Sequence, residues 1–84
     1  MLNFVEDDTR PFDYLERLEG MPDGFRARVV RIAPGLPFDA TIIMPSKLIP
    51  GDTDAERSCD RAVLNRAFPD LGSAQDWVMA WVCR

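Results

Sequence analysis

Histidine is missing from this sequence of 84 residues, and cysteine is scarce. The lack of histidine removes the commonest general base near neutral pH and the commonest neutral metal ligand. Two cysteines, Cys59 and Cys83, are too few for a disulfide framework and lack the clustered spacing of a zinc site. We expect them to be reduced, with a disulfide between them as the alternative if the segments that carry them form antiparallel helices.

Phosphate-binding loops and membrane segments are also missing. The five glycines are scattered, and no G-x-G-x-x-G or Walker pattern is present. No apolar run approaches the roughly 20 residues of a membrane helix, and Glu6, Asp7 and Asp8 interrupt the N-terminal region before a signal-like stretch could form. We therefore expect a cytoplasmic protein with no membrane partner and no nucleotide cofactor.

Basic residues are outnumbered, with 10 Lys and Arg against 14 Asp and Glu, a net charge of -4 and a pI near 4.6. This balance disfavours direct binding to nucleic acid, because that affinity comes largely from cations that release counterions from phosphates. Lys47 is the single lysine, and the resulting arginine bias is typical of a GC-rich bacterial or phage gene. Residues 1–23 hold seven acids against two arginines, so we expect an electrically polarised domain.

Catalytic and metal sites find little support among the remaining acids and thiols. The acidic run Asp52, Asp54, Glu56 and Asp60 lacks the glycine and terminal glutamate of a calcium loop. Neither cysteine has an evident activating neighbour. We expect no catalytic residue, no metal and no cofactor, and an enzyme with an unrecognised carboxylate or cysteine site is the remote alternative.

Residues 25–32 and 38–44 predict the clearest element, an antiparallel hairpin. Both segments are rich in β-branched and aromatic residues, and the segment between them has the composition of a turn. With Val29 opposite Ala40, the apolar side chains of the two strands share one face, and a shift of one residue would mix the faces. The other face then carries two arginines, Arg26 and Arg28.

Two internal segments predict helices. Residues 10–19 follow candidate capping residues, carry apolar side chains at helical spacing and end at a glycine. Residues 54–67 follow a capping box formed by Thr53 and Glu56. They carry an apolar helical stripe made of Ala55, Cys59, Ala62, Val63 and Ala67.

Residues 74–84 predict a third helix, capped by Ser73 and apolar nearly all round. One side holds Ala74, Trp77, Val78, Trp81 and Val82, and the opposite side holds Met79, Ala80 and Cys83 instead of charges. A fully buried strand is the alternative, because short apolar runs are ambiguous by periodicity. We expect the tryptophan side to enter the core, which leaves Met79 and Cys83 to face a partner.

The predicted elements, with a short strand in residues 1–5, follow the order β-α-β-β-α-α. This order predicts an α+β fold in which a small antiparallel sheet, with the hairpin 25–32/38–44 at its centre, packs against helices. We expect residues 1–84 to form one compact domain, because a chain of this size supports a single core.

The surplus of charged and apolar surface predicts a non-catalytic protein-binding module, a small bacterial or phage-encoded inhibitor or adaptor that blocks a larger protein. Size and acidity alone suggest an anti-defence protein of the anti-CRISPR type as one form of this hypothesis. The predicted partner-binding residues are Asp7, Asp8, Asp13, Glu16, Met79 and Cys83, with Arg26 and Arg28 as secondary candidates. The acids would dock on a larger protein with a basic surface. The alternative is a homodimer or other homo-oligomeric structural subunit assembled through residues 74–84.

Overall fold

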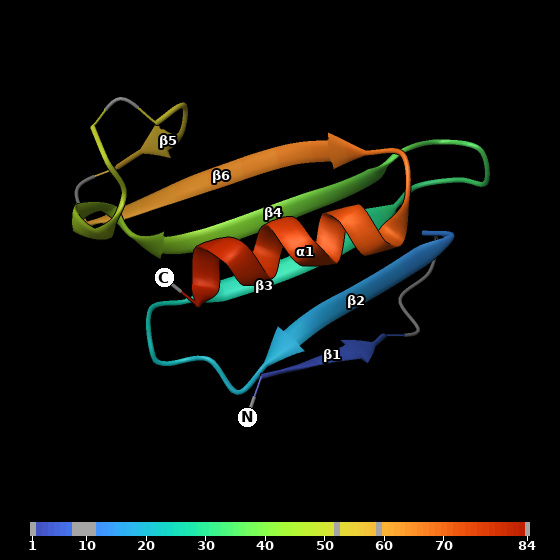
Figure 1. The fold of residues 1–84 in the computed structure, drawn as a ribbon, viewed down its shortest axis with the longest axis horizontal. Coiled ribbons are helices and arrows are strands. Elements are labelled where there is room, and N and C mark those ends of the chain that lie inside the picture. Colours follow the sequence, from blue (N-terminus) through green and yellow to red (C-terminus); the bar gives the residue numbers. More distant parts are fainter. Residues whose placement is uncertain (1, 8–11, 52, 59, 84) are drawn as a thin grey trace.

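The computed structural model describes residues 2–7, 12–51, 53–58 and 60–83. These residues form a six-stranded antiparallel sheet with the strand order β1-β2-β3-β4-β6-β5, and one α-helix packs against it (Figure 1). The elements in chain order are β1 (Asn3–Glu6), β2 (Tyr14–Glu19), β3 (Arg26–Arg31), β4 (Phe38–Pro45), the 3-10 turn η1 (Ser46–Leu48), β5 (Glu56–Arg57), β6 (Arg61–Phe68) and α1 (Leu71–Val82).

The predicted order β-α-β-β-α-α is wrong, because both internal segments predicted as helices contain strands. Within residues 10–19, strand β2 pairs with β1 on one side and with β3 on the other. The sequence of β2 does not alternate between apolar and polar residues, because Glu16, a charged residue, lies on the buried side between Tyr14 and Leu18. Pairing on both edges of the strand outweighs the weak helical spacing of its apolar residues.

Residues 54–67 were predicted as helix and instead contain β5 and most of β6. In β6 the residues alternate, with Ala62 and Leu64 buried and Arg61 and Asn65 exposed, and the strand pairs with β4 along its whole length. The Thr53–Glu56 capping box does not start a helix, and Cys59 of the predicted stripe lies outside the described residues. Eight consecutive register pairs with β4 decide the conformation of this segment.

The central hairpin is confirmed in position and register. Strands β3 and β4 pair with Val29 opposite Ala40, and both of these side chains are completely buried. The arginines Arg26 and Arg28 are exposed on the opposite side, as the alternation predicts. The strand predicted in residues 1–5 is also present, as β1 at the edge of the sheet.

Helix α1 confirms the predicted C-terminal helix over the buried-strand alternative, but it begins three residues earlier than predicted. Asp70 is the N-cap, and its carboxylate accepts a hydrogen bond from the Ser73 backbone N–H at 2.8 Å. The helix buries Ala74, Val78 and Trp81. Because truncation of a buried tryptophan to alanine costs about 3 to 5 kcal/mol, Trp81 is a principal anchor between helix and sheet.

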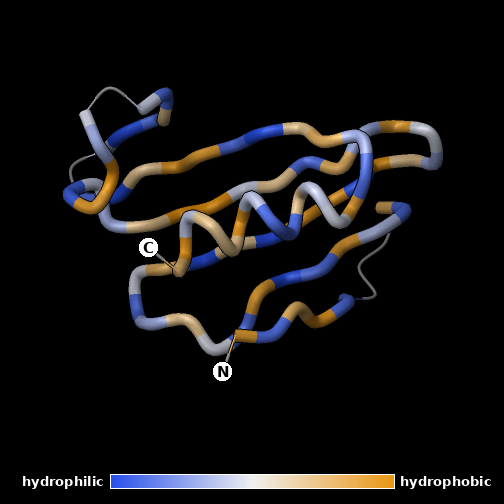
Figure 2. Tube along the Cα trace, in the orientation of Figure 1, coloured by the Kyte–Doolittle hydropathy of each residue, from blue (hydrophilic) through white to orange (hydrophobic). Residues whose placement is uncertain are grey.

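The two faces of the sheet differ in what covers them. Helix α1 lies mainly over β4, β6 and β3 on one side, here called the covered face, and Figure 2 shows apolar residues alternating with polar ones along these strands. No other helix of the described residues covers the opposite side, here called the open face. Within the same residues, no helix is long and apolar enough to cross a membrane.

Candidate functional site

The acidic residues predicted to bind a partner do not gather on one free surface. Asp7 forms an ion pair with Arg17 at 2.8 Å, and Asp13 forms one with Arg31 at 2.6 Å. Glu16 is only 3% exposed and lies on the covered face. Asp8, the remaining predicted acid, lies outside the described residues.

Glu16 joins the sheet to the helix. Its two carboxylate oxygens accept hydrogen bonds from the Tyr14 hydroxyl at 2.7 Å and from Nε2 of Gln75, on α1, at 2.8 Å. Burial, followed by the hydrogen bond to Glu16, raises the pKa of Tyr14 well above its usual range. With both oxygens occupied by internal donors, Glu16 serves the packing of α1 on β2.

The two helical residues predicted to face a partner, Met79 and Cys83, differ in exposure. Met79 is partly buried and packs against the core cluster. Cys83 is exposed and carries a free thiol, and it lies at the C-terminal cap of α1. The helix therefore presents less apolar surface to solvent than its sequence suggests, because its two tryptophans and Met79 all pack against the core.

Arg26 and Arg28, the secondary candidates, lie on the open face of β3 next to an opening in the sheet. The β2–β3 register ends at the pair Arg17↔Arg28. Beyond it, Leu18 and Glu19 still pair with β1, and Arg26 and Ala27 still pair with β4, but the two inner strands do not pair with each other. In Figure 1 the corresponding ends of β2 and β3 diverge toward the loop that connects them.

A groove of about 790 Å³ occupies this opening, lined by residues 17–21, residues 25–28, Thr41 and Ile43. Its lining includes Leu18 and Ala27, whose side chains belong to the covered face, at the positions where β2 and β3 do not pair. Ile43 is half-buried on the open face and supplies an apolar floor beside the arginines. The volume is in the range of ordinary ligand sites, roughly 300 to 1,000 Å³.

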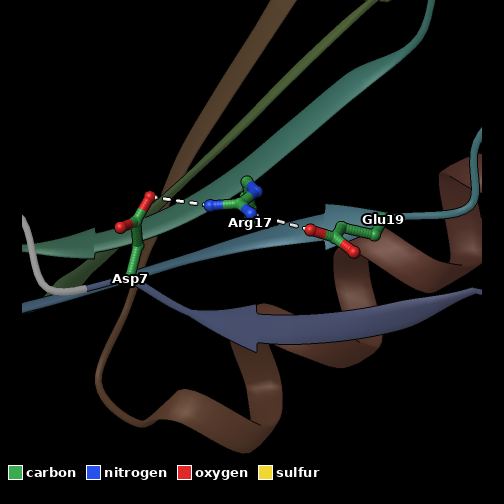
Figure 3. A network of polar contacts seen from close by, with 3 residues as sticks. All are labelled: Asp7, Arg17 and Glu19. Atoms are coloured by element: carbon green, nitrogen blue, oxygen red, sulfur yellow. Dashed lines mark hydrogen bonds and ion pairs between the residues drawn. The ribbon is translucent and has the colours of Figure 1, made fainter.

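The groove is locally basic although the chain is acidic. Arg17 is held between two carboxylates, Asp7 at 2.8 Å and Glu19 at 2.7 Å (Figure 3). The hydrogen bond and charge of Glu19, followed by the charge of Asp7, raise the pKa of Arg17, and the two carboxylates offset the positive charge of its guanidinium. Arg26 and Arg28 have no ion pair or side-chain hydrogen bond among the described residues, and they supply the unneutralised charge.

Loop geometry keeps the mouth of the groove in shape. Gly20 and Gly24, at the two ends of the β2–β3 loop, have φ angles of 89° and 88°. This left-handed conformation is costly for residues that carry a Cβ atom. A hydrogen bond from the Phe25 N–H to the Pro22 carbonyl at 3.2 Å closes the turn between them, which places Phe25 and Met21 at the groove.

Sequence reasoning found Arg26 and Arg28 but missed the other groove residues, chiefly Arg17, Glu19 and Ile43. The signal that could have found Arg17 and Glu19 is the alternation of Leu15, Arg17 and Glu19, which share one side of β2. The opening itself has no local signal, because it depends on where pairing between two strands stops.

The residues that line the groove carry groups suited to holding a ligand. Within the described ranges, no group of three or more His, Cys, Asp or Glu side chains is placed to hold a metal ion. The groove offers two unpaired guanidinium groups, a fixed Arg17 and an apolar floor. These groups can bind an anionic ligand that also carries an apolar part. Comparison of the chain with protein-family models, with curated proteins and with solved structures finds no match.

Proposed function

We propose that this protein is a non-catalytic protein-binding module that acts as an inhibitor or adaptor of a larger protein and binds it through the groove between β2 and β3. The observation that carries the proposal is the interrupted β2–β3 pairing beside two unpaired arginines, Arg26 and Arg28. A sheet that stops pairing internally leaves main-chain and side-chain surface of both strands available to another molecule.

The groove is better suited to a partner than the acidic residues of the N-terminal region. Asp7 and Asp13 already pair with arginines of the same chain, so a partner would have to displace those arginines. Arg26 and Arg28 are exposed and have no such competitor in the described part of the chain. The groove also offers apolar area at Ile43, Phe25 and Met21. Burial of this area by a partner contributes affinity, and the charges of the arginines contribute orientation.

The test is quantitative affinity capture from cells that express the chain, comparing the native protein with the charge-reversed variant R26E/R28E. The control is K47E/R66E, which makes the same change in net charge at two exposed positions outside the groove. We expect a partner that the native protein and the control retain and that R26E/R28E loses. Equal capture by all three proteins, or capture of nothing above background, would overturn the proposal.

A second copy of the chain is the second candidate partner, favoured by the position of β1. This strand is the last in the strand order, so its outer edge has no strand neighbour among the described residues. Unpaired edges template pairing with other chains. Light scattering during size exclusion distinguishes the candidates, since a strict monomer at high protein concentration excludes self-association.

A further inference from the structure

We infer that the occupant of the groove is an extended acidic peptide segment of the partner, with two carboxylates and one apolar side chain at alternate positions. This inference rests on the proposed function and names the chemistry of its partner. Its basis is the placement of Arg26 and Arg28 along β3, with Ile43 beside Arg26 on the neighbouring strand β4.

The spacing of the arginines selects an extended ligand. Arg26 and Arg28 are two residues apart on β3, so their side chains leave the same face roughly 7 Å apart. Alternate side chains of an extended peptide have the same separation, so carboxylates at positions i and i+2 meet the two guanidinium groups together. Guanidinium–carboxylate pairs are charge-assisted and frequently bidentate, which fixes the direction of the peptide as well as its place.

The apolar side chain is placed by the same periodicity. Continuing the alternation past Arg26 on the open face leads to Gly24, which has no side chain, whereas Phe25 alternates to the covered side and packs, like Met21, against the core cluster. Ile43 lies opposite Arg26 in the β3–β4 register and provides the floor at this point. An apolar side chain two residues beyond the carboxylate that binds Arg26 would therefore lie over Gly24, within diagonal reach of Ile43, and the recognised pattern is apolar-x-acid-x-acid.

A protein segment fits this surface better than a nucleic acid. The chain has a net charge of -4, and Glu19 with Asp7 stands beside the groove, so a continuous phosphate backbone meets repulsion outside the two arginines. Single-stranded nucleic acid also needs aromatic stacking surfaces, and Phe25 is the one aromatic residue among the lining residues. A short segment with two carboxylates needs only the local charge.

The experiment measures fluorescence polarisation of a labelled probe peptide with the sequence Leu-Ser-Glu-Ser-Glu, called the alternating probe. Three further probes are the glutamine analogue, a peptide of the same composition with adjacent glutamates, and a single-stranded oligonucleotide. We expect saturable binding of the alternating probe, weakened by salt. R26Q/R28Q should weaken it about tenfold or more, because two charge-assisted pairs are lost, whereas the charge-matched control K47Q/R66Q should leave it unchanged.

A separate variant tests the apolar position. Ile43→Thr keeps a β-branched residue in β4 and shortens the floor, so it should weaken the leucine probe several-fold and leave a probe with serine in place of leucine unaffected. Circular dichroism and urea unfolding confirm that each variant is folded.

The outcomes separate this inference from the proposed function. Failure of the alternating probe to bind, equal binding of the adjacent-glutamate probe, or tighter binding of the oligonucleotide overturns the acidic-peptide inference. If R26E/R28E still loses a captured partner in any of those cases, the proposed function stands with a partner of different chemistry. If R26E/R28E captures the same proteins as the native chain, both the acidic-peptide inference and the proposed function are wrong.

Discussion

Replacing Gln75 with methionine should destabilise the protein by about 2 kcal/mol, although the two side chains have similar size and helix propensity. Nε2 of Gln75 donates to Glu16 at 2.8 Å, and the Tyr14 hydroxyl supplies the second donor at 2.7 Å. Glu16 is 3% exposed, so water cannot replace the lost donor without opening the contact between α1 and β2. A hydrogen bond to a charged group is worth about 1.5 to 3 kcal/mol, and partial burial of the methionine offsets a fraction of it.

Urea unfolding followed by tryptophan fluorescence is the direct assay, since both tryptophans lie on α1 and Trp81 is buried. In a domain of this size, a loss of about 2 kcal/mol corresponds to a decrease in Tm of roughly 8 to 16 °C. Ala80→Met, at an exposed position of the same helix, controls for the introduction of methionine and should change the stability by less than about 0.5 kcal/mol.

A double-mutant cycle with Glu16→Gln isolates the contact from other effects of either change. We expect the two substitutions together to cost less than the sum of their separate costs, with a coupling of roughly 1 kcal/mol or more. Additive costs, or a Gln75→Met variant as stable as the native protein, would refute the idea that this hydrogen bond fastens the helix to β2.

Two further predictions concern Tyr14 and the helix cap. Tyr14 is the single tyrosine, and burial with the Glu16 hydrogen bond raises its pKa. The unfolded chain should release this proton near pH 10 while the folded chain retains it, so stability should decrease as the pH rises above about 10. Tyrosinate absorbance measures both states, and coincident titrations of native and urea-unfolded protein would contradict this. Asp70→Ala should cost about 1 kcal/mol because it removes the N-cap acceptor, whereas Asp76→Ala, on the exposed side of α1, should cost clearly less in the same urea assay; equal costs would argue against Asp70 as the cap.

Part of the candidate site could be predicted from the sequence. Arg26 and Arg28 follow from the hairpin alternation, which assigns them to the face opposite the core. Arg17 and Glu19 were not recognised as their neighbours, because residues 10–19 were interpreted as a helix. On a helix these residues would have no relation to β3, whereas in β2 they line the same groove.

The sequence by itself determined the elements whose local and long-range preferences agree. The β3–β4 hairpin has period-two apolar residues and a turn composition, and both point to the register with Val29 opposite Ala40. The C-terminal helix follows a capping residue and carries apolar side chains at helical spacing, although its start at Leu71 depends on which residue, Asp70 or Ser73, accepts the capping hydrogen bond.

Tertiary structure decided the conformation of β2 and β6 and, with it, the groove. Both segments have apolar residues at helical intervals, and their strand conformation is stabilised by partners distant in sequence, as in the pairing of Ile42 with Leu64. Such pairing energy cannot be read from a local window, because it exists only when the neighbouring strand is in place. The opening between β2 and β3 is harder still to predict from the sequence, because it depends on the residue at which the pairing between these two strands ends.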